Sequence, residues 1–389
     1  MPRSRKSGNP LSAAPAASGY AMPAEWEPHA ATWLAWPHNH DDWPGKFEPI
    51  PWVYAEIIRN LARHERVELI VNNARAQTQA RKLLQQANAL SANVHFHRWP
   101  TNRVWLRDSG CIFLTAQPGF ARSDSREPAL SLPKGRLSPH KPLAMKFRFN
   151  AWAKYPNWRH DEKIGTLMAR AAHVHEIRPI TNATLPTRAR IVLEGGSIDV
   201  NGRGTLLTTE ECLLSKVQER NPGMTRVHYE KAFADYLGAP NVIWLGRGIA
   251  GDDTHGHVDD LTRFVSSDTV VTMVEPNSRD ANHGPLLTNL RRLQAARDQH
   301  GKPLNIVELP MPAPIVFEGR RLPASYANFY IANCVVLVPV FNDPNDRVAL
   351  NTLTRLFPTR SVVPIYAGDL IWGLGTLHCM TQQQPAARE

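Results

Sequence analysis

Apolar residues recur with a helical period at six places along the chain. Val53, Ile57, Ile58 and Leu61, for example, would line one face of a single helix. The same pattern predicts helices near residues 51–64, 74–90, 161–174, 225–238, 285–299 and 346–357. Because the last four helices start roughly 60 residues apart, the pattern indicates a repeating unit.

Short β-rich runs separate these helices. The pattern predicts strands at residues 67–71, 94–97, 241–245, 269–274, 305–309, 335–340 and 361–366. A unit of several strands and one helix thus recurs about five times, which is typical of an α/β repeat architecture. No GxGxxG motif follows a predicted strand, so a dinucleotide-binding fold is not supported, and the chain has no Walker A motif either.

The composition excludes several classes of protein. Apolar residues make up 42% of the 389 residues and charged residues 21%, which excludes a disordered or fibrous chain. The longest apolar stretch, residues 331–341, is too short to span a bilayer, so no membrane partner is expected. The four cysteines form no CxxC pair, which argues against a disulfide scaffold and against a cysteine-rich zinc site.

The positive charge of the chain is concentrated in one stretch. Lys and Arg outnumber Asp and Glu by 45 to 35, and residues 121–148 hold seven basic and two acidic side chains, half of the net +10. Several prolines and the lack of any period predict a basic, Pro-rich surface insertion near residues 117–144. Residues 121–144 have no aromatic side chain to stack on bases, so no nucleic-acid partner is expected.

The N-terminal segment differs from the rest in composition. Residues 1–20 are rich in Pro, Ala, Ser and Gly, and no apolar segment follows the basic residues Arg3, Arg5 and Lys6 as it would in a signal peptide. We therefore predict a disordered tail over residues 1–20, a single catalytic domain over residues 21–385 and a cytoplasmic location.

Four polar segments adjoin apolar strands. They read WLRDSG (105–110), LEGGSI (193–198), GDDTHGHVDD (251–260) and GLGTLHCM (373–380). Since each lies in a different repeat, each could present a side chain at a common centre, and the glycines would let the backbone approach a ligand closely. Together they offer a cysteine, a histidine and at least three carboxylates.

This set of side chains favours hydrolysis at a guanidinium carbon. A cysteine beside a histidine is the smallest nucleophile and acid–base pair. Several carboxylates around the reacting carbon would oppose the oxyanion of ordinary acyl transfer. A guanidinium, in contrast, has five N–H donors in a fixed fork that two carboxylates can grip.

Other readings of these residues are open at this point. Cys379 could be an inert buried thiol, Asp108 a local ion-pair partner, and Glu194 a turn residue. From another class, a metal-dependent amidohydrolase could use the His255–His257 pair with nearby aspartates as metal ligands. That motif, however, lies past the middle of the chain and no barrel pattern accompanies it.

Seven ordered motifs make the chain resemble a known family. They are MPAEWEPH (22–29), WLRDSG (105–110), FNAW (149–152), LEGGS (193–197), LLTTEECLL (206–214), GHVD (256–259) and HCMTQQ (378–383). They resemble the agmatine deiminase family, also called the bacterial-type peptidylarginine deiminase family, of the guanidine-modifying pentein superfamily. The resemblance covers residues 20–385 and implies a five-bladed, pseudo-symmetric α/β propeller of ββαβ units.

The resemblance also implies catalytic roles. Cys379 would be the nucleophile that forms a covalent amidino-thioether. His257 would protonate the departing ammonia and then take a proton from water, and Glu194 would orient His257. The family uses neither a metal nor an organic cofactor. The products would be ammonia and, if the substrate is agmatine, N-carbamoylputrescine.

Substrate binding is implied for three further residues. Asp108 and Asp259 would hold the guanidinium, and Trp105 lies in the same motif as Asp108. The partner is thus a small cationic guanidino compound, and assembly into a homo-oligomer stays open. Agmatine is the leading substrate. Arginine or peptidyl arginine is the alternative, because Arg103, where the family's agmatine deiminases have an acidic residue, could bind an α-carboxylate.

Overall fold

One order of elements recurs along the chain in the computed structural model, which describes residues 14–117, 141–181 and 189–387. Two strands pair antiparallel, a helix follows, and a third strand pairs parallel with the second. The unit nearest the C-terminus consists of β16 (Tyr330–Ile331), β17 (Val335–Val340), α8 (Pro344–Leu356) and β18 (Ser361–Tyr366).

Three further units have the same order. One consists of β5 (Ile112–Ala116), β6 (Leu143–Met145), α4 (Asp161–Ala171) and β7 (His175–Ile177). The next consists of β8 (Asp199–Val200), β9 (Thr205–Thr209), α6 (Arg226–Leu237) and β10 (Asn241–Leu245). The third consists of β11 (Thr262–Phe264), β12 (Thr269–Val274), α7 (His283–Ala295) and β13 (Asn305–Pro310).

The fifth unit joins the two ends of the described chain. β19 (Gln382–Pro385) pairs antiparallel with β2 (His29–Ala35), and β3 (Arg66–Val71) pairs parallel with β2 after α1 (Ile50–Leu61). α2 (Ala74–Gln86) and β4 (Val94–Arg98) add one more parallel strand to this sheet. The first strand of the unit therefore comes from the C-terminal end of the chain and the second from the N-terminal end.

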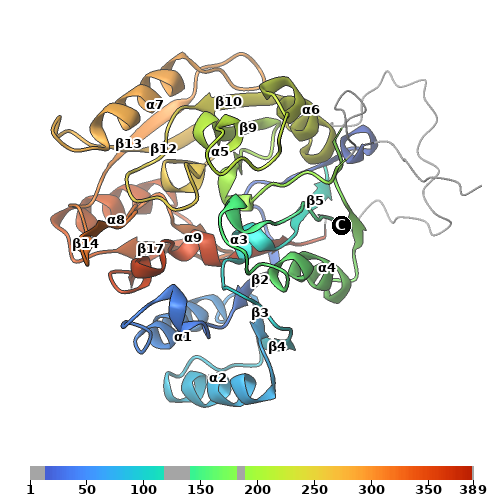
Figure 1. Cartoon of the computed structure of the whole chain (residues 1–389), viewed down its shortest axis with the longest axis vertical. Coiled ribbons are helices and arrows are strands. Elements are labelled where there is room, and N and C mark those ends of the chain that lie inside the picture. The colour runs from blue at the N-terminus through green and yellow to red at the C-terminus, as the bar shows by residue number, and fades with distance from the viewer. Residues whose placement is uncertain (1–13, 118–140, 182–188, 388–389) are drawn as a thin grey trace, which may run out of the picture.

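All six predicted helices and all seven predicted strands are confirmed, with ends shifted by a few residues. The ends follow local rules: α8 begins where Asp343 caps the backbone and Pro344 occupies the first turn, and α6 ends at Gly238, which has a left-handed φ of 65°. The long helices lie around the outside of the molecule (Figure 1). No helix in the described ranges has the length and apolar character needed to cross a membrane.

Short helical turns precede the first strands of four units. They are α3 (Leu106–Ser109) ahead of β5, η4 (Gly195–Ser197) ahead of β8, η5 (Val258–Asp260) ahead of β11, and α9 (Leu377–Met380) ahead of β19. α3 and α9 lie near the middle of the molecule in Figure 1 and contact each other.

The largest apolar cluster holds the first and last elements together. It includes Trp33 of β2, Ile57 of α1, Leu337 of β17 and Leu377 of α9, all of them fully or almost fully buried. Because α9 packs into this core, its backbone is fixed by apolar contacts on one side while its other side remains available for chemistry.

Ordered structure begins before the predicted boundary at residue 20. Residues 1–13 lie outside the described ranges, but Pro15–Ser18 forms a 3-10 helix that contacts α6. Tyr20–Ala21 forms β1, which pairs with β5. Pro15 and Tyr20 are buried, and their burial explains why this Ala- and Pro-rich segment is ordered.

Most of the predicted insertion, residues 118–140, also lies outside the described ranges. At its N-terminal edge Gln117 is buried, and at its C-terminal edge Leu143 and Ala144 already belong to β6. A strand therefore occupies the last part of the segment that the sequence assigns to the insertion.

Candidate active site

The predicted site residues lie in the short turns ahead of equivalent strands. α3 carries Asp108, Glu194 is the residue before η4, His257 precedes η5 and Asp259 lies within it, and α9 carries Cys379. All five are nearly or fully buried. The repeat thus supplies the site, because the turns ahead of the first strands of four units each carry a functional side chain.

Gly196 shows how closely these side chains converge. A Cβ added there would lie 2.6 Å from His257 Nδ1 and 3.0 Å from both Asp108 Oδ1 and Asp259 Oδ2. The Gly196 backbone N–H also donates to Asp108 Oδ1 at 3.0 Å. Only glycine leaves room for this arrangement, so the Gly195–Gly196 pair of the sequence motif has a steric reason.

Cys379 lies beside one carboxylate and one amide. Its Sγ is 3.7 Å from Asp259 Oδ2, and Asn328 Nδ2 donates to Sγ at 3.1 Å. Burial raises the pKa of the Cys379 thiol well above its usual value, and the carboxylates of Asp259, Asp260 and Asp108 raise it further. The thiol of the unliganded protein is therefore protonated at neutral pH.

Trp105 packs against the segment that carries the nucleophile. A Cβ added at Gly375 would lie 2.9 Å from the Trp105 ring and 3.2 Å from Cys379 Cβ. Trp105 and Cys379 also line the same cavity. The structure thus places Trp105 in the wall of the site next to Cys379.

His257 lies between two carboxylates without a tight hydrogen bond to either. Its Nε2 is 3.8 Å from Glu194 Oε2 and its Nδ1 is 3.9 Å from Asp108 Oδ1. Burial lowers the pKa of His257, but Asp108, Cys212 and Glu194 together raise it well above 6.5. At neutral pH the ring is therefore an imidazolium that can donate a proton.

Glu194 remains ionised because of a neighbour that the sequence did not reveal. Burial would raise the pKa of Glu194, but Arg220 and His257 lower it to about 2. Arg220 Nε donates to Glu194 Oε1 at 3.2 Å, and both side chains are fully buried. Arg220 thus fixes the carboxylate that faces His257.

Asp108 is held by Trp152, whose backbone is unusual. Trp152 Nε1 donates to Asp108 Oδ2 at 2.9 Å. Ala151, Trp152 and Ala153 all have positive φ, which is costly for residues with side chains. Burial, with help from Asp259 and Glu194 against the opposing effect of His257, raises the pKa of Asp108 to about 6.

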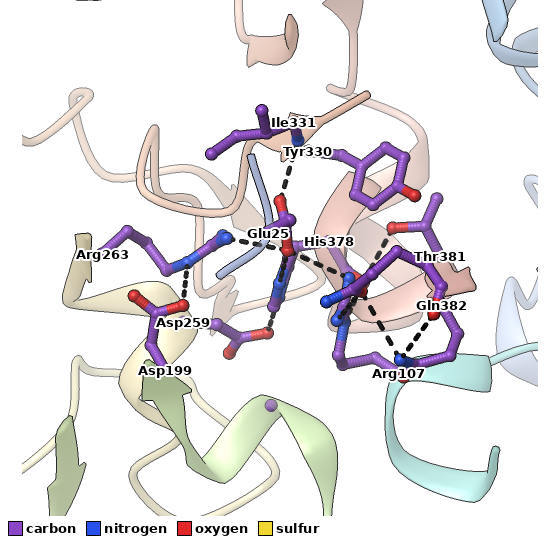
Figure 2. Close-up of polar contacts among 12 residues, drawn as sticks. Glu25, Arg107, Asp199, Asp259, Arg263, Tyr330, Ile331, His378, Thr381 and Gln382 are labelled. Atoms are coloured by element: carbon purple, nitrogen blue, oxygen red, sulfur yellow. Dashed lines mark hydrogen bonds and ion pairs between the residues drawn. The ribbon is translucent and has the colours of Figure 1, made fainter. Parts of the chain in front are cut away.

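Asp259 is anchored by a chain of buried charges (Figure 2). Its Oδ2 is 2.6 Å from His378 Nδ1, and His378 Nε2 is 2.8 Å from Glu25 Oε2. Arg263 and Arg107 reach the same Glu25 oxygen at 3.0 and 3.3 Å. Despite burial, these cations keep the pKa of Glu25 well below its usual value, and His378 keeps that of Asp259 low. Asp259 Oδ1 has no hydrogen-bond partner among the described residues.

Replacing Glu25 with glutamine should destabilise the fold, because the change leaves three buried cationic or hydrogen-bonding partners facing a neutral amide. Breaking a buried ion pair typically costs about 3–5 kcal/mol. Urea denaturation would measure the loss in the free energy of unfolding. Glu308, which is exposed on β13, is the matched control. Its change to glutamine should stay within about 0.5 kcal/mol, and equal stability of both variants would contradict the anchoring role.

The cavity beside the predicted nucleophile has a volume of about 300 Å³, and Cys379, Asp108, Trp105 and Trp152 lie in its wall. Its rim carries charged pairs. Asp42 binds Arg103, whose guanidinium also lies 4.3 Å from the Tyr155 ring centroid. Asp42 Oδ2 has no hydrogen-bond partner among the described residues.

Asp253 forms a second charged group at the rim. It accepts hydrogen bonds from Lys154 Nζ at 2.5 Å, from Tyr155 Oη at 2.6 Å and from Arg320 at 3.1 Å. Arg103, Lys154 and Arg320 therefore all have an acidic partner, and Arg103, the candidate for binding an α-carboxylate, is already paired with Asp42.

The His255–His257 metal alternative does not match the geometry. His255 has a left-handed φ of 67°, and its Nε2 lies 3.0 Å from Ser215 Oγ in a different pocket. Asp252 accepts backbone N–H groups of Gly256 and His257 instead of facing a metal position. Within the described ranges, the ligand atoms that do gather are those of Glu194, Cys212 and His257, within 4.8 Å of one another.

Comparisons with known proteins point to one family. A family model described as Porphyromonas-type peptidyl-arginine deiminase matches residues 21–385. Over 404 aligned residues the chain is 32% identical to an agmatine deiminase of Pseudomonas aeruginosa (strain UCBPP-PA14), and the alignment covers 98% of this chain and 99% of that protein.

Solved structures give the same result. The agmatine deiminase of Enterococcus faecalis is 27% identical, with a TM-score of 0.82 over 97% of this chain and 98% of that chain. The agmatine deiminase of C. jejuni is 25% identical, with a TM-score of 0.76 over 95% of this chain and 97% of that chain.

Proposed function

This chain belongs to the Porphyromonas-type peptidyl-arginine deiminase family, and from this premise we propose that it is an agmatine deiminase. It would hydrolyse the guanidinium of agmatine to N-carbamoylputrescine and ammonia. One observation carries the proposal: Cys379 Sγ lies 3.7 Å from Asp259 at the wall of a cavity that also contains Asp108. Two carboxylates beside a thiol suit a planar cation attacked at carbon.

The two aspartates would bind the substrate before any bond changes. Guanidinium N–H groups would donate to Asp108 and to the unpartnered Oδ1 of Asp259. The substrate cation also opposes the negative charges that raise the pKa of the Cys379 thiol, so binding would lower that pKa and favour the thiolate. The nucleophile would thus form only when its target is present.

Bond changes would then follow in two halves. The thiolate forms a C–S bond at the guanidinium carbon, His257 gives its proton to the leaving nitrogen, and the C–N bond breaks to release ammonia. Water next attacks the amidino-thioether carbon while His257 takes a proton from it. The C–S bond breaks, which returns the thiolate, and the hydroxyl proton passes to the solvent to leave the ureido product. No step needs a metal or an organic cofactor, because the substrate carries its own positive charge.

The rim of the cavity favours a distal ammonium over a carboxylate. Asp42 lines the cavity, and its Oδ2 is a buried acceptor with no partner among the described residues. Burial, against the opposing effect of Arg103, raises the pKa of Asp42 to about 6, so it is ionised at neutral pH. An ammonium at the far end of agmatine would supply the missing donors, whereas the α-carboxylate of arginine would meet this charge unfavourably.

Replacing Asp42 with asparagine should raise the KM for agmatine by roughly 10- to 150-fold while kcat changes little. A hydrogen bond to a charged group contributes about 1.5–3 kcal/mol. Steady-state kinetics would measure the effect, with the exposed Asp268→Asn as the control. In the wild type, KM should also rise as the pH falls below about 6 and both Asp42 and Asp108 take up protons, and D42N should remove only the part that belongs to Asp42. An unchanged KM in D42N would remove Asp42 from substrate binding.

Colorimetric detection of the ureido product tests the function directly. Agmatine, free arginine and a short arginine peptide are assayed side by side with the purified protein. We expect turnover of agmatine with a kcat/KM well above that of the other two. A higher kcat/KM for arginine or the peptide would replace the substrate but keep the chemistry, whereas no ureido product from any of the three would overturn the proposal.

We also propose that the five ββαβ units are arranged as blades of a pseudo-symmetric propeller. Two features support this arrangement. The unit that contains β19 and β2 joins the two ends of the chain, as a ring of blades requires. Turns ahead of equivalent strands in four units carry residues that reach one centre.

A further inference from the structure

Cys212 is a third functional group beside His257 and Glu194 that the proposed mechanism does not use. It lies in α5 (Glu210–Leu214), where its backbone N–H donates to Thr209 Oγ1 at 3.1 Å, and it is 1% exposed. Its sulfur, a His257 nitrogen and a Glu194 oxygen all lie within 4.8 Å of one another. A thiolate, an imidazole and a carboxylate are each ligands that zinc takes in proteins.

The atoms that face this point lack partners. Glu194 Oε2 and both ring nitrogens of His257 are buried and make no hydrogen bond within the described part of the chain. Arg220 Nε donates only to the other carboxylate oxygen of Glu194, Oε1. Buried polar atoms without hydrogen bonds are costly, so the arrangement favours a further ligand. Because the His257 ring is an imidazolium at neutral pH, a metal ion would have to displace a proton from it.

The spacing fits a zinc ion with small movements. His257 Nε2 and Glu194 Oε2 are 3.8 Å apart, and an ion bound at about 2.0–2.2 Å from each atom spans that distance. A Zn–S bond of about 2.3 Å would require a sulfur at the 4.8 Å limit to move inward by about 1–1.5 Å. Asp108, 3.9 Å from His257 Nδ1, adds negative charge nearby.

We propose that Glu194, Cys212 and His257 form an inhibitory Zn²⁺ site. Three protein ligands leave a fourth position for water, but the ion would differ from a catalytic zinc because it occupies the nitrogen lone pair that His257 needs for proton transfer. Binding would therefore stop turnover without contacting Cys379. The inhibitory effect rests on the proposed function, whereas metal binding itself does not.

The binding experiment uses full-length Cys379→Ser protein, so that the predicted nucleophile cannot act as a ligand. Calorimetric titration with ZnCl₂ should give one site per chain. Adding Cys212→Ser should weaken the affinity more than about 100-fold, since even outer-shell partners of zinc ligands are worth ~10- to 100-fold. Cys111, which is buried and free, provides the matched control, and Cys111→Ser should leave the affinity unchanged.

Cobalt gives a second reading of the same site. Co²⁺ in place of Zn²⁺ should show a thiolate charge-transfer absorption band that persists in Cys379→Ser and disappears in Cys212→Ser. Thermal melting checks that each variant is folded, and Cys212→Ala replaces Cys212→Ser if the serine variant does not fold. Absence of metal binding, or binding that depends on Cys379 and not on Cys212, would overturn the proposal.

An inhibition assay distinguishes failure of the metal-site proposal from failure of the proposed function. Zinc should inhibit agmatine turnover by the wild type, and EDTA should restore it. The zinc concentration for half inhibition should rise at least about tenfold in Cys212→Ser, and an equal value in both proteins would contradict inhibition through this site. If the wild type does not turn over agmatine, the proposed function fails while the calorimetric and cobalt results still decide the metal site.

Discussion

Replacing Cys379 with serine should abolish deimination and leave the fold intact. Among the described residues, no other side chain in the cavity wall can supply an equivalent nucleophile, and a serine hydroxyl is far harder to ionise than a thiol. Loss of the nucleophile in a catalytic unit lowers kcat by roughly 10⁴-fold or more. Serine is smaller than cysteine and can accept the hydrogen bond from Asn328 Nδ2, so the free energy of unfolding should change by less than about 1.5 kcal/mol.

The ureido assay and urea denaturation measure these two effects in the same preparations. Cys334→Ser is the control, because Cys334 is exposed and lies outside the cavity wall, and it should keep wild-type turnover. Mass spectrometry of the wild type quenched during turnover should show an added amidino group on Cys379. Turnover by Cys379→Ser at even a tenth of the wild-type rate would exclude the covalent mechanism.

Replacing Asp108 with asparagine should weaken both substrate binding and the rate. Asp108 accepts hydrogen bonds from Gly196 N–H and Trp152 Nε1, so an amide NH₂ in place of either oxygen would point a donor at a donor. The substitution also removes the negative charge of Asp108, which faces the substrate cation as soon as the substrate binds. Losing a charge-assisted pair of this kind costs about 2–5 kcal/mol, or roughly 30- to several-thousand-fold in kcat/KM.

Glu194→Gln should behave differently, because Glu194 faces His257 and not the substrate. Turnover should fall while agmatine still binds. The imidazolium of His257 loses part of its stabilisation, so the alkaline limb of the kcat profile should move to lower pH. Calorimetric titration of agmatine into Cys379→Ala, with and without each carboxylate substitution, separates the two roles. Equal loss of binding in both double variants would mean that Glu194 contacts the substrate.

The six long helices of the described chain could be predicted from sequence, but the short helices α3, α5 and α9 and the strand that joins the chain ends could not. α1 and α4 have a clear apolar stripe because each packs one face on a sheet. β2 is buried on both faces and contains Ala30, Ala31 and Ala35, so it shows no alternation, and Thr32 is its single β-branched residue. Its pairing with β19 and β3 makes it a strand, and such pairing is not visible in a local window.

The predicted site residues do lie together, but their supporting residues could not be predicted. Cys379, His257 and Asp108 stand out because reactive side chains in glycine-rich turns are unusual. Asn328 and Arg220 have no such local signal, and they gain their roles only because the fold brings them to Cys379 and Glu194. Likewise, spacing alone suggested that His255 and His257 act together, whereas the left-handed backbone at His255 turns its ring away.

The pairing of β19 with β2 also sets the order in which the site can be assembled. Asp108, Glu194, His257 and Asp259 all precede Cys379 in the chain, and the turn that carries Cys379 is held between the core and a strand that must find its partner near residue 30. Such long-range pairing forms late in folding. A growing polypeptide would therefore have the carboxylates of the site well before it has the thiol. Synthesis would have to pass Cys379 and β19, and β19 would have to pair with β2, before any guanidinium could be attacked.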